Sequence, residues 1–222
     1  MSDVSNAIAA LRSGALVVLP TDTVYGLAAA WDSPVGVRRV FAAKGRDDER
    51  PAGVLFASVD AVRGALPDLD RPTMRVLEAL LPGPYTFVVE TAVPRPRGVG
   101  TDDSLGVRVP AHPPLLEFLA ALGTPLVATS ANVSGLPDAI ALDEVDPTVL
   151  AHCVAALDFG EPAGGVACLT AGAPSRSGAS QRGIASTVVD LRPLAQGGRA
   201  LVLREGSVPA NDVLEQIEKA LQ

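Results

Sequence analysis

Apolar residues follow two periods along the chain, and each period predicts one kind of element. Short apolar runs rich in β-branched residues and bounded by turn residues predict buried strands. Such runs occupy residues 15–19, 52–58, 85–91, 105–110, 125–129, 154–160, 186–192 and 199–205. Apolar residues at helical spacing, opened by Pro or Asp and closed by Gly or Pro, predict helices. These segments cover residues 5–12, 34–43, 59–66, 70–81, 113–123, 143–152 and 209–221.

The order of these elements predicts the fold class. Strands that alternate with short helices indicate a single α/β domain over residues 1–222. Consecutive strands near residues 85–109 and 187–204 indicate a sheet that mixes parallel and antiparallel pairs. The Gly/Ser-rich segment 160–186 is too long for an ordinary connection. It is either a flexible surface loop or a lid over a site.

Composition narrows the class of protein. The 222 residues are 48% hydrophobic, which is typical of a compact globular chain rather than a disordered one. No secretory signal and no apolar run long enough to span a bilayer is present, so we expect a cytoplasmic protein without a membrane partner. A net charge of -7 disfavours a protein that wraps nucleic acid, although a local basic cleft is compatible with it.

The absence of common motifs excludes several chemistries. The chain has no P-loop, no G-x-G-x-x-G turn and no set of Cys and His residues spaced for a metal. Cys153 and Cys168 are expected to be buried free thiols. His112 and His152 are solitary, and a structural role is the more common one for such residues. We therefore expect no protein-bound metal site.

Four polar groups sit mostly at strand ends, where open α/β sheets bind ligands. The first is the turn Thr21, Asp22, Thr23 and Tyr25. Its hydroxyls and carboxylate suit recognition of a small polar substrate. Equally, Asp22 suits a self-contained turn in which it bonds nearby backbone amides.

The second group is cationic and follows a predicted helix. Lys44, Arg46 and Arg50 lie within seven positions, and a lysine with arginines suits a polyphosphate. Cations at a helix C-terminus also complement the helix dipole, and the acidic residues 47–49 offer ion-pair partners. Because the chain has only two lysines, Lys44 and Lys219, Lys44 is a specific choice rather than a generic positive charge.

The third and fourth groups lie on strands. Arg108 interrupts an apolar strand, so its guanidinium must face solvent or a buried anion, for which a substrate carboxylate is one candidate. At residues 129–135 a strand breaks into "TSANVSG". There Ser130 and Asn132 offer donors and acceptors where small residues allow a ligand to approach closely.

Seven segments occur together in the order found in the YrdC-like family, the threonylcarbamoyl-AMP synthases. They are "PTDTVYGL", "AKGR", "LLPGPYTFVV", "GVRVPAH", "VATSANVSG", "STVVDL" and "LREG". The chain resembles that family over roughly residues 5–208. The resemblance implies a single twisted α/β domain with a concave, positively charged ligand pocket.

The same resemblance implies an activity and its partners. Members join L-threonine, bicarbonate and ATP, with Mg²⁺, into threonylcarbamoyl-AMP and pyrophosphate. The product serves threonylcarbamoylation of adenosine 37 in tRNAs that read ANN codons, with the tRNA met directly or through a threonylcarbamoyl transferase complex. The reaction requires alignment of two anions and no protein nucleophile.

The site residues carry over position by position from the resemblance. The residues expected to hold threonine, with Arg108 on its carboxylate, are Thr23, Tyr25, Arg108 and Ser186. The residues expected to hold ATP are Lys44, Arg46, Arg50, Ser104, Ser130, Asn132 and Arg204. Of these, Lys44 and Arg46 are expected to stabilise charge on the transferring phosphate.

Four positions depart from the family pattern. Asp47 and Arg50 stand where proline and asparagine are usual, Leu55 stands about where a histidine is common, and Asp138 replaces a serine that often contacts nucleotide. These departures favour an alternative: a YciO-like nucleotide- or RNA-binding module of the same fold without efficient synthase activity. The retained pairs Lys44/Arg46 and Ser130/Asn132 favour the enzyme.

Overall fold

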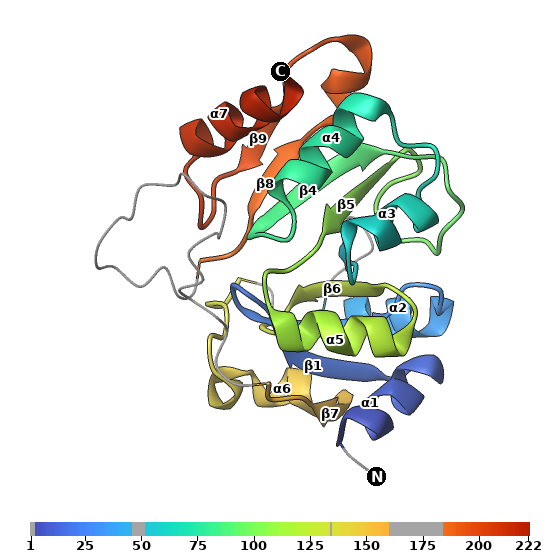
Figure 1. Cartoon of the computed structure of the whole chain (residues 1–222). Helices are drawn as coiled ribbons and strands as arrows, with labels where there is room; N and C mark the ends of the chain where they lie inside the picture. The colour runs from blue at the N-terminus through green and yellow to red at the C-terminus, as the bar shows by residue number, and fades with distance from the viewer. Residues whose placement is uncertain (1–2, 46–51, 134, 160–183) are drawn as a thin grey trace.

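The computed structural model describes residues 3–45, 52–133, 135–159 and 184–222 (Figure 1). Its strands are β1 (Leu16–Pro20), β2 (Tyr25–Ala30), β3 (Gly53–Leu55), β4 (Tyr85–Glu90), β5 (Ser104–Arg108), β6 (Leu126–Ser130), β7 (Cys153–Ala156), β8 (Thr187–Asp190) and β9 (Leu201–Arg204). Its helices are α1 (Asp3–Arg12), α2 (Pro34–Ala43), α3 (Val59–Ala65), α4 (Arg71–Leu80), α5 (Pro113–Leu122), α6 (Pro147–Leu150) and α7 (Ala210–Leu221). Short 3-10 helices cover Leu142–Glu144 and Arg192–Gln196.

The strands form one mixed sheet, as the sequence predicts. Its order is β7-β1-β2-β6-β3-β5-β4-β8-β9. The pairs β4/β5 and β8/β9 are antiparallel, whereas β4/β8, β3/β5 and β1/β7 are parallel. None of the described helices is long and apolar enough to cross a lipid bilayer.

The strand β2 is absent from the sequence prediction. Its residues are Tyr-Gly-Leu-Ala-Ala-Ala, and glycine and alanine have low strand propensity. The strand nevertheless pairs with β1 on one side and β6 on the other, and all six residues are buried. Tertiary packing on both faces therefore replaces local propensity as the cause of this strand.

The prediction of one helix over residues 143–152 is wrong. The 3-10 turn Leu142–Glu144 and the short helix α6 occupy parts of this segment instead, and β7 begins directly after it at Cys153. Proline disfavours the helical conformation in the residue before it, and Asp146 precedes Pro147 with an extended ψ of 127°. Asp146 caps α6 by accepting a hydrogen bond from the Thr148 amide, so a new helix begins there.

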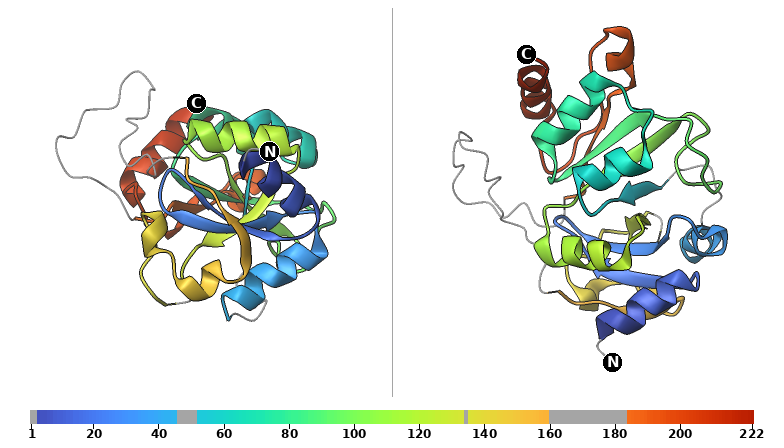
Figure 2. Two further views of the ribbon diagram at one scale, coloured as in Figure 1. Left: turned by 90° about the horizontal axis from the view of Figure 1, so that it is seen from below. Right: turned by 45° about the vertical axis from the view of Figure 1, so that its right-hand side comes forward.

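The strands of this one sheet and the helices around them form two groups, which lie one above the other in Figure 1 and in the right-hand view of Figure 2. The lower half contains β7, β1, β2 and β6 with α1, α2, α5 and α6, and it carries the N-terminus. The upper half contains β5, β4, β8 and β9 with α3, α4 and α7, and it carries the C-terminus. Three-residue β3 joins them by pairing with β6 and β5. Strands of the lower half run crosswise to those of the upper half in Figure 1, which shows the strong twist of the sheet.

The lower half has helices on both faces of its strands. Leu11 of α1 and Phe118 of α5 pack with Val17 on one face, while Val40 of α2 and Val149 of α6 pack with Val18 on the other. Because neighbouring residues in a strand point to opposite faces, β1 is apolar and buried throughout.

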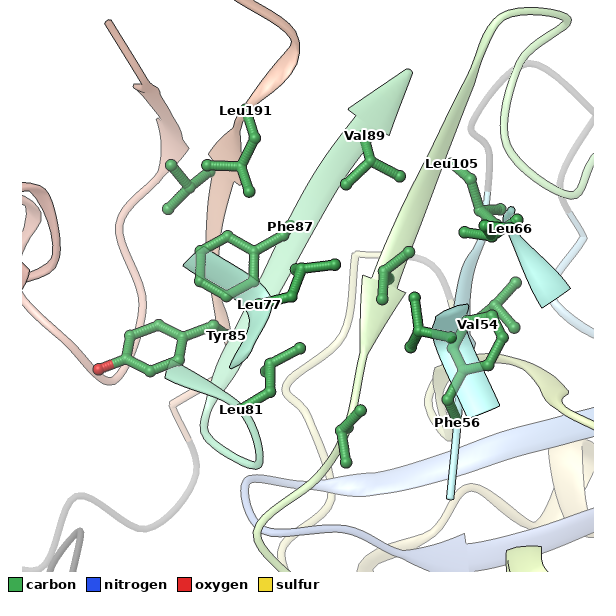
Figure 3. Close-up of a cluster of buried hydrophobic side chains, with 14 of the residues drawn as sticks. Val54, Phe56, Leu66, Leu77, Leu81, Tyr85, Phe87, Val89, Leu105 and Leu191 are labelled. Atoms are coloured by element: carbon green, nitrogen blue, oxygen red, sulfur yellow. The ribbon is translucent and has the colours of Figure 1, made fainter. Parts of the chain in front are cut away.

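In the upper half, the helices that the structure describes lie on one face of the strands. Tyr85, Phe87 and Val89 of β4 pack with Leu105 of β5 and Leu77 of α4 in one apolar core (Figure 3). The intervening residues of these strands point to the opposite face, which none of the described helices covers. That uncovered face lies against the turn at the end of β1, and it forms one wall of the cavity described next.

Candidate functional site

An open cavity of about 490 Å³ lies at the junction of the two halves. This volume is within the range typical of small-molecule sites. It brings together eight of the sequence-predicted binding residues: Thr23, Tyr25, Ser104, Arg108, Ser130, Asn132, Ser186 and Arg204. Arg46 and Arg50 lie outside the described residues, as do Asp47, Cys168 and most of the segment 160–186.

The Arg108 guanidinium is hydrogen-bonded through Nη2, whereas its Nε and Nη1 donors are unused among the described residues. Its Nη2 donates to Asp22 Oδ1, to Thr23 Oγ1 at 2.7 Å and to Thr21 Oγ1 at 3.4 Å. The described residues supply no hydrogen-bond partner for its Nε, which is buried, or for its Nη1. The side chain is 11% exposed and lines the cavity, so its unused donors suit an anion bound there.

The interpretation of Asp22 as the brace of its own turn is wrong. Its side chain is 4% exposed and pairs with Arg108, while Oδ2 accepts from the Ala111 amide at 3.0 Å. Thr21 braces the turn instead, because its hydroxyl accepts from the Thr23 and Val24 amides and donates to Val24 O. Asp22 thus neutralises a buried guanidinium and fixes its orientation.

Lys44 and the turn after β6 form one hydrogen-bonded network. Lys44 is the C-cap residue of α2 and is only 2% exposed. Its Nζ donates to Ser130 O at 2.6 Å and to Asn132 Oδ1 at 2.7 Å. Ser130 Oγ donates to the same Asn132 oxygen at 2.6 Å. The ammonium therefore serves acceptors on another element, which the helix-dipole interpretation of Lys44 does not predict.

The upper wall of the cavity is a second polar surface. Ser186 Oγ and Thr86 Oγ1 lie 2.8 Å apart, and Arg204 Nη2 donates to Ser186 O at 2.9 Å. Ser104 Oγ lies 2.6 Å from Thr101 Oγ1. Thr86 was not a sequence candidate, although its place between Tyr85 and Phe87 in an alternating strand is a usable signal for a residue on the other face.

Strand β5 carries residues from both predicted binding sets. Ser104, Gly106 and Arg108 all line the cavity because alternate residues share one face. Between the two side chains, Gly106 lies opposite Gly53 of β3, and a Cβ built at Gly106 would come 3.4 Å from the Gly53 Cα. The floor of the cavity between the two side chains is therefore bare backbone.

Two of the positions that depart from the family pattern also line this cavity. Leu55 is buried in β3, and Asp138 lies on the loop after β6. Both residues therefore belong to the site rather than to a remote surface. A carboxylate at Asp138 adds negative charge to a cavity that, among the described residues, has Arg108 and Arg204 as its cationic lining.

The neighbouring titratable groups have structural roles. Burial lowers the pKa of His112 below its ordinary value, and the charge of Asp22 only partly opposes this effect. The unprotonated His112 Nδ1 accepts from the Leu115 amide at 3.2 Å and caps α5. Burial raises the pKa of the free thiol Cys153 to about 11, so it stays protonated and unreactive at neutral pH.

This arrangement suits one class of protein: proteins that bind small anionic substrates in a cavity on an open face of an α/β sheet. In the part of the chain that is described, no group of three His, Cys, Asp or Glu side chains is arranged to hold a metal ion. Arginines, hydroxyls and a glycine floor instead provide donors and close backbone approach for carboxylate or phosphate groups.

Comparison with known proteins identifies the family. The family model Sua5_yciO_yrdC, described as "Telomere recombination", matches residues 9–168. A threonylcarbamoyl-AMP synthase of Pyrococcus abyssi (strain GE5 / Orsay) is 33% identical over 95% of this chain and 55% of its own length. A threonylcarbamoyl-AMP synthase of Xanthomonas euvesicatoria pv. vesicatoria (strain 85-10) is 37% identical over 67% of this chain and 81% of its own.

A solved structure shows the same architecture. The crystal structure of P. abyssi Sua5 complexed with L-threonine superposes with a TM-score of 0.80 at 27% identity, covering 98% of this chain and 58% of that one. The chain belongs to the Sua5/YciO/YrdC family, and both the predicted resemblance and the α/β fold class are confirmed. It spans little more than half the length of the archaeal relative.

Proposed function

We propose that this protein forms threonylcarbamoyl-AMP and pyrophosphate from L-threonine, bicarbonate and ATP. Bicarbonate takes up a proton and loses water to give carbon dioxide, which the amine of threonine captures as a carbamate with release of a proton. A carbamate oxygen then attacks the α-phosphorus of ATP, and the bond to pyrophosphate breaks. The task of the protein is to align two anions and to offset their repulsion.

One observation carries the proposal: Arg108 presents unused guanidinium donors to the cavity beside the Thr23 hydroxyl. A planar guanidinium edge matches a carboxylate, so L-threonine would bind there with Tyr25 and Ser186 on the surrounding walls. The name of the P. abyssi structure, which is a complex with L-threonine, supports this choice of substrate.

ATP would occupy the rest of the cavity. Ser130, Asn132, Ser104 and Arg204 line this part of the cavity. Lys44 does not line it, but its ammonium donates to Ser130 O and Asn132 Oδ1. We assign Arg46 and Arg50 to the same substrate by resemblance. Mg²⁺ commonly binds nucleotide phosphates and one or two carboxylates, so it would arrive with ATP as part of the substrate. Transfer of the product to adenosine 37 of tRNA would require the tRNA itself or a transferase complex.

The alternative, a YciO-like binding module without efficient synthase activity, rests on Leu55 and Asp138 lining the cavity. The family model includes the YciO branch and does not separate the two. The relatives described above carry the synthase name, so the alternative is not favoured.

The deciding assay incubates the purified protein with ATP, L-threonine, bicarbonate and Mg²⁺. We expect threonine-dependent pyrophosphate and an adenylate with the mass of threonylcarbamoyl-AMP. Arg108→Lys keeps a charge for Asp22 but removes the second donor edge. It should raise KM for threonine on the order of ten- to a hundredfold, since a hydrogen bond to a charged group contributes about 1.5–3 kcal/mol.

Arg199→Lys is the matched control, because Arg199 is 87% exposed and pairs with Glu218 on the surface. That variant should behave like the unmodified protein. Pyrophosphate release that does not depend on threonine, or no release at all, would contradict the proposed activity.

A further inference from the structure

The loop between β4 and β5, residues 91–103, is built around one guanidinium. Arg95 Nε donates to Val99 O at 2.8 Å, and Nη1 donates to Val93 O at 2.6 Å and to Thr91 O at 3.3 Å. Its Nη2 donates to Thr101 O and to Ser104 O, the latter at 3.1 Å. The five N–H donors of arginine therefore meet five backbone carbonyls, four of them in this loop and the fifth at Ser104 directly after it.

The last of these carbonyls belongs to a cavity residue. Ser104 begins β5, and its carbonyl accepts from Arg95 and also from the Thr101 amide at 2.8 Å. Thr101 Oγ1 lies 2.6 Å from Ser104 Oγ, so the hydroxyl that faces the cavity is oriented by Thr101. Arg95 thus holds both the backbone of Ser104 and the residue that orients its side chain.

The packing of the loop leaves this segment little freedom to shift. Gly98 has φ +90°, and a Cβ there would come 2.5 Å from Phe41 Cε2. Gly100 has φ +68°, lines the cavity, and a Cβ there would come 2.1 Å from Ser104 O. The backbone therefore passes close to both Phe41 and Ser104, and only glycine fits at either position. The Arg95 guanidinium donates to the carbonyl of Val99, which lies between these two glycines in the sequence.

We propose that Arg95 is a positioning residue for nucleotide binding, which acts by holding Ser104 and Gly100 at the edge of the cavity. Arg95 is absent from the residues that line the cavity, so it acts through the loop rather than by touching a substrate. Arg108 and Thr23, two of the proposed threonine residues, have no hydrogen bond to this loop among the described residues. A substitution at Arg95 should therefore lower the affinity for ATP and leave the affinity for L-threonine nearly unchanged.

The test compares Arg95→Lys with Arg97→Lys. Lysine keeps the charge but has three donors on one atom, so it cannot reach all five of these carbonyls. Arg97 is two positions along the same loop and exposed, which makes it a matched control. Binding of ATP and of L-threonine is measured separately by calorimetry, and melting temperature and adenylate formation are recorded for each variant.

We expect Arg95→Lys to weaken ATP binding on the order of ten- to a hundredfold, the scale on which small displacements act. Threonine affinity should stay within about twofold, and Arg97→Lys should leave both affinities unchanged. Unchanged ATP affinity in Arg95→Lys overturns the inference. Equal loss of both affinities together with a lower melting temperature also overturns it, because that pattern indicates a general structural role.

Thr101→Val provides a second variant if Arg95→Lys does not fold. Thr101 is exposed, so its loss costs little stability, yet the variant removes the hydroxyl that orients Ser104 Oγ. A selective loss of ATP affinity is expected, and unchanged affinity contradicts the route through Ser104. The inference rests on the proposed function for its assignment of Ser104 to ATP. Calorimetry needs no turnover, so ATP binding without adenylate formation would refute the synthase while still testing Arg95.

Discussion

At the scale of single residues, Lys44 is a buried charge whose ammonium is hydrogen-bonded within the protein. Its ammonium donates to Ser130 O at the end of β6 and to Asn132 Oδ1 in the turn that follows. Lys44→Ala would leave both acceptors without this donor and should lower the free energy of unfolding by about 1–3 kcal/mol. Adenylate formation should fall on the order of a hundredfold, because a fixed charge near the phosphates is lost.

The matched control is Lys219→Ala, which removes the other lysine of the chain. Lys219 is 68% exposed and pairs with Glu215 on α7, and such surface pairs contribute little. Urea denaturation and the pyrophosphate assay should therefore give unchanged values for this variant. Full activity in Lys44→Ala would contradict a role in catalysis and would favour the interpretation of Lys44 as a cation at the end of α2.

Single residues were predicted better than the contacts between them. Arg108 was a candidate because an apolar strand cannot hold an unpartnered guanidinium, and that reasoning requires only local sequence. Its partner Asp22 is 86 residues away along the chain, and no local pattern connects the two. The sequence therefore offers only two interpretations of Asp22, a brace of its own turn or part of a ligand-facing cluster, and does not predict the ion pair with Arg108.

At the scale of elements, helix α5 depends on a titratable cap. The Leu115 amide donates to unprotonated His112 Nδ1, and burial keeps the pKa of His112 lowered. In the unfolded chain a histidine takes up its proton near pH 6.5. As pH falls below that value, the unfolded state binds a proton that the folded state resists, so stability decreases.

This dependence can be measured by urea denaturation between pH 7.5 and pH 5.5. His112→Asn retains a capping acceptor but does not titrate, so its stability should depend less on pH than that of the unmodified protein. The difference in slope is at most about 1.4 kcal/mol per pH unit for one proton. His152→Asn controls for an exposed histidine. An identical slope for His112→Asn would contradict this role.

Elements with strong local signals were predicted, and those set by the surroundings were not. Pro34 and Pro113 open α2 and α5 where the sequence places them. β2 was missed because its small residues become a strand only between β1 and β6. The loop that Arg95 organises gave no signal beyond its Pro, Gly and Arg content, since its bonds run to backbone carbonyls, which every residue has.

At the scale of the whole molecule, the cavity lies where the two halves meet, and one apolar cluster crosses this junction, since it contains Phe41 of α2 and Val127 of β6 as well as Phe87 of β4. Arg108 on β5 bonds to Asp22 and Thr23 from the lower half, and three-residue β3 supplies the continuous backbone pairing. Substrates that fill the cavity would contact both halves. Their binding should therefore stabilise both, by about 2.7 kcal/mol when a ligand is present at 100 times its Kd.

Hydrogen exchange can measure this coupling. With saturating ATP and L-threonine, amides of β1 and β2 and amides of β4 and β8 should all exchange more slowly than in the free protein. Peptides from α7 that face solvent serve as an internal reference. Protection confined to one half would show that the substrates do not bridge the junction.

On β5, side chains alternate between the cavity and the helix-covered face, which limits how the spacing of the site residues can change. A strand advances about 3.3 Å per residue, so Ser104 and Arg108 lie roughly 13 Å apart as a property of backbone geometry. Inserting or deleting one residue between them would turn Arg108 onto the helix-covered face. The spacing between the two proposed binding side chains is therefore adjustable only in steps of two residues, and loops elsewhere in the chain cannot alter it.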